Sequence, residues 1–312
     1  MRLNDIDFTG FQNNLIYANN QSEKIRGEMG LTGLSVKDKN FFAIIESKLQ
    51  NMGFEIYYTD KLQNFEFNGK VLGHIPSITI FKDKYNKENG GSIYIYKNYS
   101  PKKKRELLIH ELIHIKDTIT PTLSNNDLDT NNVFMLSIYT LKRIEMFTEL
   151  VALALMMPNT VLQSDLFNCA YDMNKIENDY RAVETSTIMM WIMLNDYFHG
   201  HYAMLYQFKS ANGPLLQRVD EFSNAESKFD IANIVLNTGS IAYKSWTTRQ
   251  SQSGESTIDN KNYQCFCFYE KDIQQPLPSD TSPVEMIIKC DKMVIIGWSK
   301  NIYDFIQKLK FK

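Results

Sequence analysis

The sequence predicts an α+β fold with about two domains. At 312 residues the chain is long enough for two hydrophobic cores, and its 43% apolar and 22% charged content is typical of a globular protein. Short segments with the alternation of β-strands, such as Ser92–Lys97, come before long helix-like segments. Strand-like segments return after Gly213 and are followed by a helix-like segment, Asn301–Lys310. This mixture of helices and strands indicates the α+β class.

The first 100 residues are predicted to form an N-terminal arm, one helix and several strands. Residues 1–35 lack a long apolar period and are expected to form an arm or a short helix. Asp38 or Asn40 could cap a helix that ends at Gly53. The segments with strand-like composition are Phe54–Tyr58, Phe65–Phe67, Ser77–Phe81 and Ser92–Lys97. In the last of these, Ile93 and Ile95 alternate with Tyr94 and Tyr96, as in a half-exposed strand.

The segment Ser100–Asp117 is predicted to be a buried helix that carries three polar side chains. Ser100 is a good N-cap and Pro101 a good first helical residue. His110 and His114 are one turn apart, so both rings can bind one metal ion, and Glu111 beside them can take a proton from an attacking water. This H-E-x-x-H pattern is typical of zinc peptidases and predicts a Zn²⁺ cofactor. The alternative is a buried helix whose histidines only make hydrogen bonds, but burying these groups without a cation is costly.

A second helix, roughly Val133–Met157 and stopped by Pro158, is predicted to complete the site. A catalytic zinc site needs three protein ligands and one open position, so a third ligand must come from elsewhere, and we choose Glu145. Glu149, one turn further along, could accept the second ring N–H of a ligating histidine. The alternative is a solvated acidic pair on a surface helix, although like charges at that spacing mildly repel.

The strand before the metal helix is a candidate substrate-binding element. In peptidases of this general kind, an edge strand beside the metal pairs with the substrate backbone. Tyr94 and Tyr96 on that strand are therefore candidate substrate contacts. The alternative is that they reflect strand composition alone, because aromatic residues favour strands.

Two stretches resemble the ImmA/IrrE family of bacterial metallopeptidases. They are H-E-L-I-H at 110–114 and R-I-E-M-F-T-E-L-V-A-L-A-L-M-M-P at 143–158. The resemblance covers roughly residues 40–198 and implies a zincin-like domain, a zinc cofactor and a protein substrate. That substrate is typically a transcriptional repressor cut in a stress or mobile-element response. Counting back from Pro158 places Glu145 at the family's metal-ligand glutamate, and Glu149 remains the other candidate where the second motif diverges.

The remainder of the chain is predicted to form a helical segment and a C-terminal domain. The expected boundaries are 1–158 for the zincin-like domain, 159–212 for helices that resemble a helix-turn-helix, and 213–312 for a small α+β domain. The helix expected at Ser186–Tyr197 has no Lys or Arg, so direct DNA binding is not favoured. The first of these helices is expected at Asp165–Asp172, and His201 is expected in a loop. Further on, the sequence predicts a helix near Ala225–Leu236, a polar loop at Ser251–Asn262, and strands at Tyr263–Tyr269, Val284–Lys289 and Met293–Trp298. The C-terminal domain is a candidate sensor of a small-molecule or protein signal, or a docking module for the substrate.

Charge and cysteine content point to a cytoplasmic protein. The net charge of −2 gives no electrostatic argument for a nucleic-acid or membrane partner, and no signal peptide or membrane span is apparent. The four cysteines show no disulfide framework, and a thiol cluster in the C-terminal domain is less common than buried free cysteines. The basic run Lys102–Arg105 is either a solvated face or a contact for an acidic partner. Besides a zinc endopeptidase, the sequence allows a metal-binding regulator without proteolytic activity, or a DNA-binding regulator.

Overall fold

The chain folds into two compact units of mixed helices and strands, which confirms the α+β class. A computed structural model describes residues 11–67, 70–73, 75–83, 86–116, 138–195, 198, 200–208, 216–223, 234–235, 237–277 and 286–310. One unit, here the N-terminal unit, is formed by Asp7–Pro158 with Pro276–Ile287. The other, here the C-terminal unit, is formed by Asn159–Gln275 and Ile288–Lys312 with Met1–Ile6. A boundary thus follows Pro158, whereas 159–212 and most of 213–312 belong to one unit.

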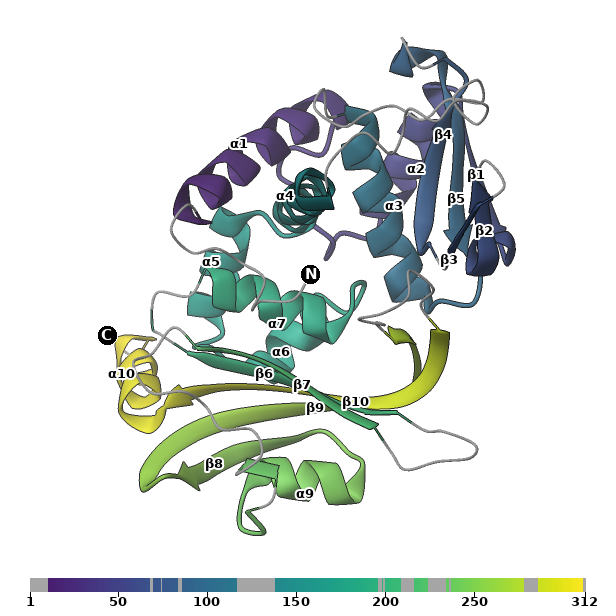
Figure 1. Cartoon of the computed structure of the whole chain (residues 1–312). Coiled ribbons are helices and arrows are strands. Elements are labelled where there is room, and N and C mark those ends of the chain that lie inside the picture. The colour runs from purple at the N-terminus through teal and green to yellow at the C-terminus, as the bar shows by residue number, and fades with distance from the viewer. Residues whose placement is uncertain are drawn as a thin grey trace. The chain divides into compact units, whose positions relative to one another are not determined.

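In its described residues, the N-terminal unit combines four helices with a three-stranded and a two-stranded sheet; Figure 1 shows their arrangement. Its elements are α1 (Phe11–Met29), α2 (Phe41–Asn51), β1 (Phe54–Thr59), the 3₁₀ turn η2 (Lys61–Asn64), β2 (Phe65–Phe67), β3 (Lys70–Gly73), β4 (Ser77–Phe81), the 3₁₀ turn η3 (Lys87–Asn89), β5 (Gly91–Tyr96), α3 (Pro101–Lys116) and α4 (Ile138–Met156). The helix α4 contacts both α1 and α3. The segment Thr120–Asn132, which its polar composition with several Asn and Asp predicts to be a loop, lies outside the described residues. So does the start of the predicted second helix.

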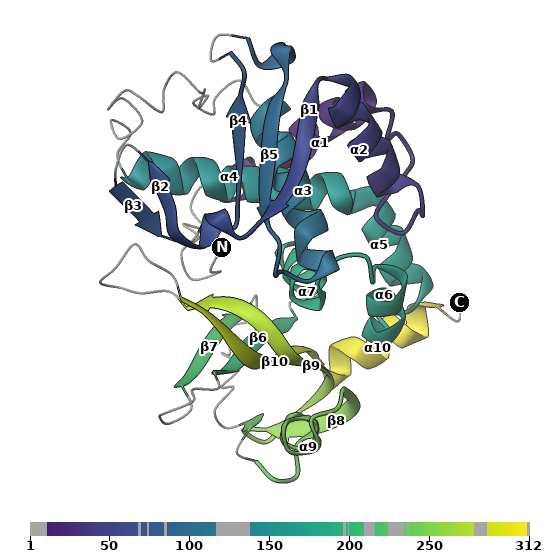
Figure 2. The same cartoon turned by 90° about the vertical axis from the view of Figure 1, so that its right-hand side faces the viewer.

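The middle strand of the N-terminal sheet is β5, not an edge strand (Figure 2). The order is β1-β5-β4, with β5 parallel to β1 and antiparallel to β4. Paired residues in a sheet share a face, so Ile93 and Ile95 lie on the same face as their partners Thr79 and Ser77. The expectation that the strand before the metal helix would offer a free edge is therefore wrong. Strand position depends on partners distant in the sequence, which local alternation does not reveal.

The arm or short helix expected in residues 1–35 is instead the 19-residue helix α1. The sequence of α1 shows no long apolar period, because its buried face also includes a polar side chain, Arg26, with 2% of its surface exposed. The guanidinium donates hydrogen bonds to the carbonyls of Leu155 (2.7 Å), Leu31 (2.9 Å) and Leu34. Leu155 lies in the last turn of α4, where carbonyls lack helical partners. Arg26 thus fixes the C-terminal end of the helix that carries Glu145 and Glu149.

Substituting Arg26 by methionine is expected to lower the free energy of unfolding by about 3 kcal/mol, because buried carbonyls lose a charged donor. Chemical denaturation measures this change. The matched control is Glu23→Gln: Glu23 pairs with Arg26 at 3.5 Å but is 63% exposed, so little change is expected. Equal stabilities of Arg26→Met and Glu23→Gln would show that the buried hydrogen bonds do not hold α4.

The C-terminal unit places helices around a five-stranded sheet (Figure 1). Its elements are α5 (Asn159–Asn168), α6 (Met173–Asp179), α7 (Thr185–Leu194), β6 (His201–Phe208), β7 (Leu216–Ser223), α9 (Ile241–Thr248), β8 (Gln252–Ile258), β9 (Lys261–Leu277), β10 (Met286–Ser299) and α10 (Lys300–Lys310). The sheet order is β7-β6-β10-β9-β8. The closing helix expected at Asn301–Lys310 is confirmed.

Several local predictions in this unit are wrong. The helix expected at Asp165–Asp172 ends at Asn168, because Ala170 and Tyr171 adopt left-handed conformations and Asp172 caps the next helix. The polar loop expected at Ser251–Asn262 contains β8, whose polar residues alternate between exposed and partly buried positions. His201, expected in a loop, begins β6. Most of the helix expected near Ala225–Leu236 lies outside the described residues.

The two strands expected at Val284–Lys289 and Met293–Trp298 form one strand, β10, through a buried charged stretch. Asp291 and Lys292 are both fully buried. Lys292 Nζ lies 2.8 Å from Glu270 and donates to Ser186 Oγ at 2.9 Å, while Asp291 accepts from the Tyr269 hydroxyl at 2.7 Å. These partners compensate the burial of the charges, which would otherwise be costly. Charged residues looked like a strand break only because their partners lie on other elements.

Among the described residues, no single helix is long and apolar enough to cross a membrane. The consecutive segments Ile144–Met156 and Asn159–Asn168 meet that test only jointly, across a break in the helix.

Candidate metal centre

The metal helix α3 begins and ends close to the predicted positions. Pro101 is its first residue, and Ser100 Oγ accepts a hydrogen bond from Lys103 N at 3.0 Å, which is a side-chain N-cap. Its apolar residues are buried, together with Glu111. The helix is therefore anchored on the sheet while His110 and His114 remain partly accessible, at 16% and 12% exposed.

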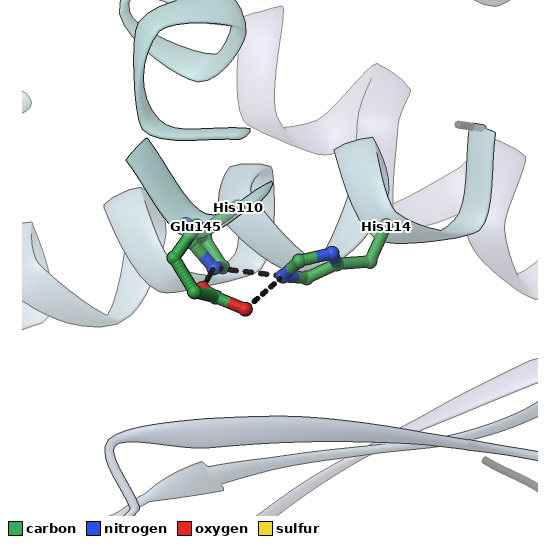
Figure 3. A group of neighbouring side chains, drawn as sticks. All are labelled: His110, His114 and Glu145. Carbon is green, nitrogen blue, oxygen red and sulfur yellow. Dashed lines mark hydrogen bonds and ion pairs between the residues drawn. The ribbon is translucent and has the colours of Figure 1, made fainter. Parts of the chain in front are cut away.

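Three predicted ligands converge at one point (Figure 3). His110 and His114 project from α3 and Glu145 from α4, and their ligand atoms all lie within 4.8 Å of one another. His110 Nε2 is 2.9 Å from His114 Nε2 and 3.0 Å from Glu145 Oε2, and His114 Nε2 is 3.6 Å from Glu145 Oε1. Ligands at zinc bond lengths in a tetrahedron are about 3.3 Å apart. The triangle therefore has the size and donor types of a site that binds a metal ion through three protein ligands.

Glu149 lies behind His110 rather than among the three converging atoms. Its carboxylate is 3.4 Å from His110 Nδ1, on the far side of the ring from Nε2. A carboxylate in this position holds the Nδ1–H tautomer and leaves Nε2 free as a ligand. The arrangement favours Glu145 over Glu149 as the third ligand.

Electrostatics around His110 favour a cation. Burial disfavours the protonated ring, yet the adjacent carboxylates of Glu145 and Glu149 outweigh it and raise the pKa of His110 to about 10. Burial alone would raise the pKa of both carboxyl groups. His110 and His114 instead lower the pKa of Glu145, and His110, with Lys103 nearby, brings the pKa of Glu149 to about 2. Two carboxylates held in their charged form beside two imidazoles provide the negative charge that a divalent cation needs.

The carboxylate of Glu111 points to the sheet and is 3% exposed. It accepts hydrogen bonds from Ser77 Oγ at 2.6 Å and Thr79 Oγ1 at 2.7 Å, both on β4. It is not one of the three converging ligand groups. Sequence reasoning missed Ser77 and Thr79, although the alternation S-I-T-I-F at 77–81 places both hydroxyls on one face of the strand.

Tyr94 and Tyr96 lie on the opposite face of the sheet from the Glu111 contacts. Tyr94 pairs with Ile78, whereas Ser77 and Thr79, which bind Glu111, pair with Ile95 and Ile93. Tyr94 stacks on Tyr57 at 5.2 Å, and Tyr96 is buried. The predicted substrate contacts of Tyr94 and Tyr96 do not fit this arrangement, because successive side chains of a strand point to opposite faces.

The basic run at the start of α3 is occupied by contacts within the unit. Lys104 lies over the ring of Tyr58 and Arg105 over that of Phe42, at 5.4 and 5.3 Å, while Lys103 pairs with Glu106 at 3.3 Å. These cation–π and ion-pair contacts account for much of the positive charge, so the run does not require an acidic partner.

The four cysteines and His201, which are also residue types that can bind metals, are buried in the C-terminal unit. The four free cysteines are buried, and burial raises the pKa of Cys265 to about 12. Burial, with Lys261 nearby, lowers the pKa of His201 to about 4, and its ring meets Tyr263 edge-on at 5.5 Å. Within the described part of the chain, neither His201 nor a cysteine belongs to the group of converging ligand atoms. These residues act as core residues there.

Comparison with known proteins gives a fold but no family. No family model matches the sequence, and no curated protein matches it. Among solved structures, the chain is similar to a Mycobacterium tuberculosis transcriptional regulator, with a TM-score of 0.56 and 9% sequence identity. The similarity covers 95% of this chain and 93% of that one. At this identity the similarity concerns the fold alone.

Proposed function

We propose that this chain is a zinc-dependent endopeptidase with a zincin-like N-terminal unit. The observation that carries the proposal is the convergence of His110 Nε2, His114 Nε2 and the Glu145 carboxylate on one point. The donor set, two imidazoles and one carboxylate, is that of hydrolytic zinc sites with one open position. The adjacent Glu111 supplies the carboxylate that peptide hydrolysis also needs.

Different residues would supply the separate steps of the proposed peptide hydrolysis. When bound, zinc would act as a Lewis acid that polarises the scissile carbonyl and stabilises the charge on its oxygen. Glu111 takes a proton from the attacking water and returns it to the leaving amine. Glu149 keeps His110 in the tautomer that presents Nε2, and Ser77 and Thr79 hold the Glu111 carboxylate from the other side.

The open edge of β4 is the proposed binding site for the substrate peptide. In the described part of the chain, β4 pairs with β5 on one side only. An extended peptide can add to such an edge through main-chain hydrogen bonds. We therefore assign the pairing with the substrate backbone to β4 and not to β5, the strand before α3. Ser77 and Thr79 of β4 also contact Glu111.

The proposed substrate is a protein of the transcriptional-repressor class, as the resemblance of 110–114 and 143–158 to the ImmA/IrrE family implies. The test is to identify the protein encoded beside this chain, to incubate it as candidate repressor with the zinc-loaded protein, and to detect new termini by mass spectrometry. Cleavage that requires zinc and is lost on chelation supports the proposal. Intact repressor, with zinc bound at the site, would favour a metal-binding regulator without proteolytic activity.

Direct DNA binding is the weaker candidate. The name of the structural neighbour suggests it, but α7, the helix that resembled a recognition helix, has no Lys or Arg and most of its side chains are buried. A recognition helix needs exposed polar or basic side chains to reach phosphates and base edges. Salt-dependent binding to duplex DNA would support a DNA-binding function.

For the C-terminal unit we propose either a sensor of a small-molecule or protein signal, or a docking module. Its sheet is assembled from distant segments, because β6 (201–208) lies beside β10 (286–299). Removing the residues that follow β6 would therefore delete both of its partner strands, β7 and β10. The unit has to be considered whole, from Asn159 onward.

A further inference from the structure

The carboxylate of Glu111 is held at both oxygens by one strand. Ser77 Oγ contacts Oε1 at 2.6 Å and Thr79 Oγ1 contacts Oε2 at 2.7 Å. All three residues are buried, with 3%, 8% and 6% of Glu111, Ser77 and Thr79 exposed. Two hydrogen bonds from a rigid strand fix both the position and the plane of a carboxylate. A single donor would leave the group free to rotate.

The same two residues face the open edge of the sheet with their main chain. Tyr96 N donates to Pro76 O and Lys82 N donates to Gly90 O, both at 3.0 Å. In an antiparallel pair these contacts alternate, so the residues in phase with Pro76 and Lys82, namely Ile78 and Ile80, bond to β5. The N–H and C=O groups of Ser77 and Thr79 then point to the other edge. The side chains of Ser77 and Thr79 thus hydrogen-bond to Glu111, while their main-chain groups face the open edge.

The contacts with the two hydroxyls leave acceptor positions of the Glu111 carboxylate available for a proton. A carboxylate has about four acceptor positions, and Ser77 and Thr79 use two of them. The remaining positions can accept a proton from water. The alternative is that the two hydroxyls only compensate the burial of the Glu111 charge. In that case, removing them would not change how a ligand binds to the metal.

Resting on the proposed function, we infer that Ser77 and Thr79 are positioning residues that hold the Glu111 carboxylate in the orientation from which it accepts the proton of the attacking water. They act through Glu111 and are not among the converging metal ligands. The proposal predicts that removing the hydroxyls weakens any interaction that requires the oriented carboxylate, while metal binding is retained.

The test uses a small probe in place of an unidentified substrate. Acetohydroxamic acid chelates a metal through its two oxygens and gives its hydroxyl proton to a neighbouring base. The full-length protein is loaded with Co²⁺, and the probe is titrated while the visible absorption of the metal is recorded. The variants are Ser77→Ala, Thr79→Val, Thr79→Ser and Glu111→Gln, with Ser92→Ala as a control. Ser92 pairs with Ile80 and lies on the opposite face of the sheet.

We expect Thr79→Val and Ser77→Ala each to weaken hydroxamate binding about 10-fold, since each removes a hydrogen bond to a charged group. Glu111→Gln should weaken it further, Thr79→Ser should retain wild-type affinity because it keeps the hydroxyl, and Ser92→Ala should have no effect. Co²⁺ affinity should change less than about twofold in all of them, as none is a ligand. With a cleaved substrate available, kcat should fall and KM should change little.

The outcomes separate the inference from the proposed function. Wild-type affinity in both Ser77→Ala and Thr79→Val, with weakening in Glu111→Gln, overturns the inference and leaves the proposed function intact. A loss in Thr79→Ser equal to that in Thr79→Val would assign the residue to packing, which also overturns it. If the wild type holds no metal, or Glu111→Gln binds the probe normally, the proposed function fails and the inference fails with it.

Discussion

Substituting alanine for His110 or His114 is expected to abolish stoichiometric zinc binding. Each ring supplies one of three ligand atoms, with the two Nε2 atoms 2.9 Å apart, so its loss leaves an incomplete site. Metal content after dialysis, measured by mass spectrometry, should fall from about one zinc per chain to near zero. The matched control is Glu106→Gln, a buried carboxylate of the same helix that pairs with Lys103 outside the site. It should keep its zinc, and full zinc in both histidine variants would refute the site.

The two glutamates of α4 should differ in the same measurement. Glu145→Ala removes a ligand and should reduce zinc affinity far more than Glu149→Ala, which removes only a hydrogen-bond partner of His110. The loss of such a partner costs roughly 10–100-fold in metal affinity. The opposite order would make Glu149 the third ligand.

Replacing Glu111 by glutamine is expected to stop proteolysis while zinc remains bound. Glutamine keeps the shape of the side chain but cannot accept the proton, and loss of a general base lowers the rate by about 10²–10⁴-fold. A time course of repressor cleavage, with metal content measured on the same samples, tests this. Cleavage by Glu111→Gln at the wild-type rate would exclude Glu111 as the base. Absence of cleavage in the wild type as well would favour a regulator that only binds metal.

The elements that sequence patterns predicted well are those set by neighbouring residues. Ser100 and Pro101 start α3 by a side-chain cap and a preset backbone angle, both of which are local. The spacing of His110 and His114 likewise places both rings on one side of the helix, so their convergence follows from helical geometry. The placement of Glu145 near them could be proposed from the need for a third ligand and from the family resemblance of 143–158, but only the packing of α4 on α3 places it there.

The features that the sequence did not predict depend on partners far along the chain. Whether β5 is an edge or a middle strand depends on its pairing with β1 and β4, and the alternation of its own residues does not predict that pairing. The burial of Arg26 was not predicted, because its acceptors, such as the Leu155 carbonyl, are distant in sequence. Lys292 interrupted an apolar run for the same reason, since Glu270 and Ser186 compensate its charge from other elements.

The most direct test of the account is anomalous diffraction at the zinc absorption edge from crystals of the zinc-loaded protein. The account predicts one peak per chain, bound by His110 Nε2, His114 Nε2 and a Glu145 oxygen, with Glu149 hydrogen-bonded to His110 Nδ1. Zinc–nitrogen distances should be about 2.0–2.1 Å. A zinc ion bound elsewhere, or no peak between these three side chains, would contradict it.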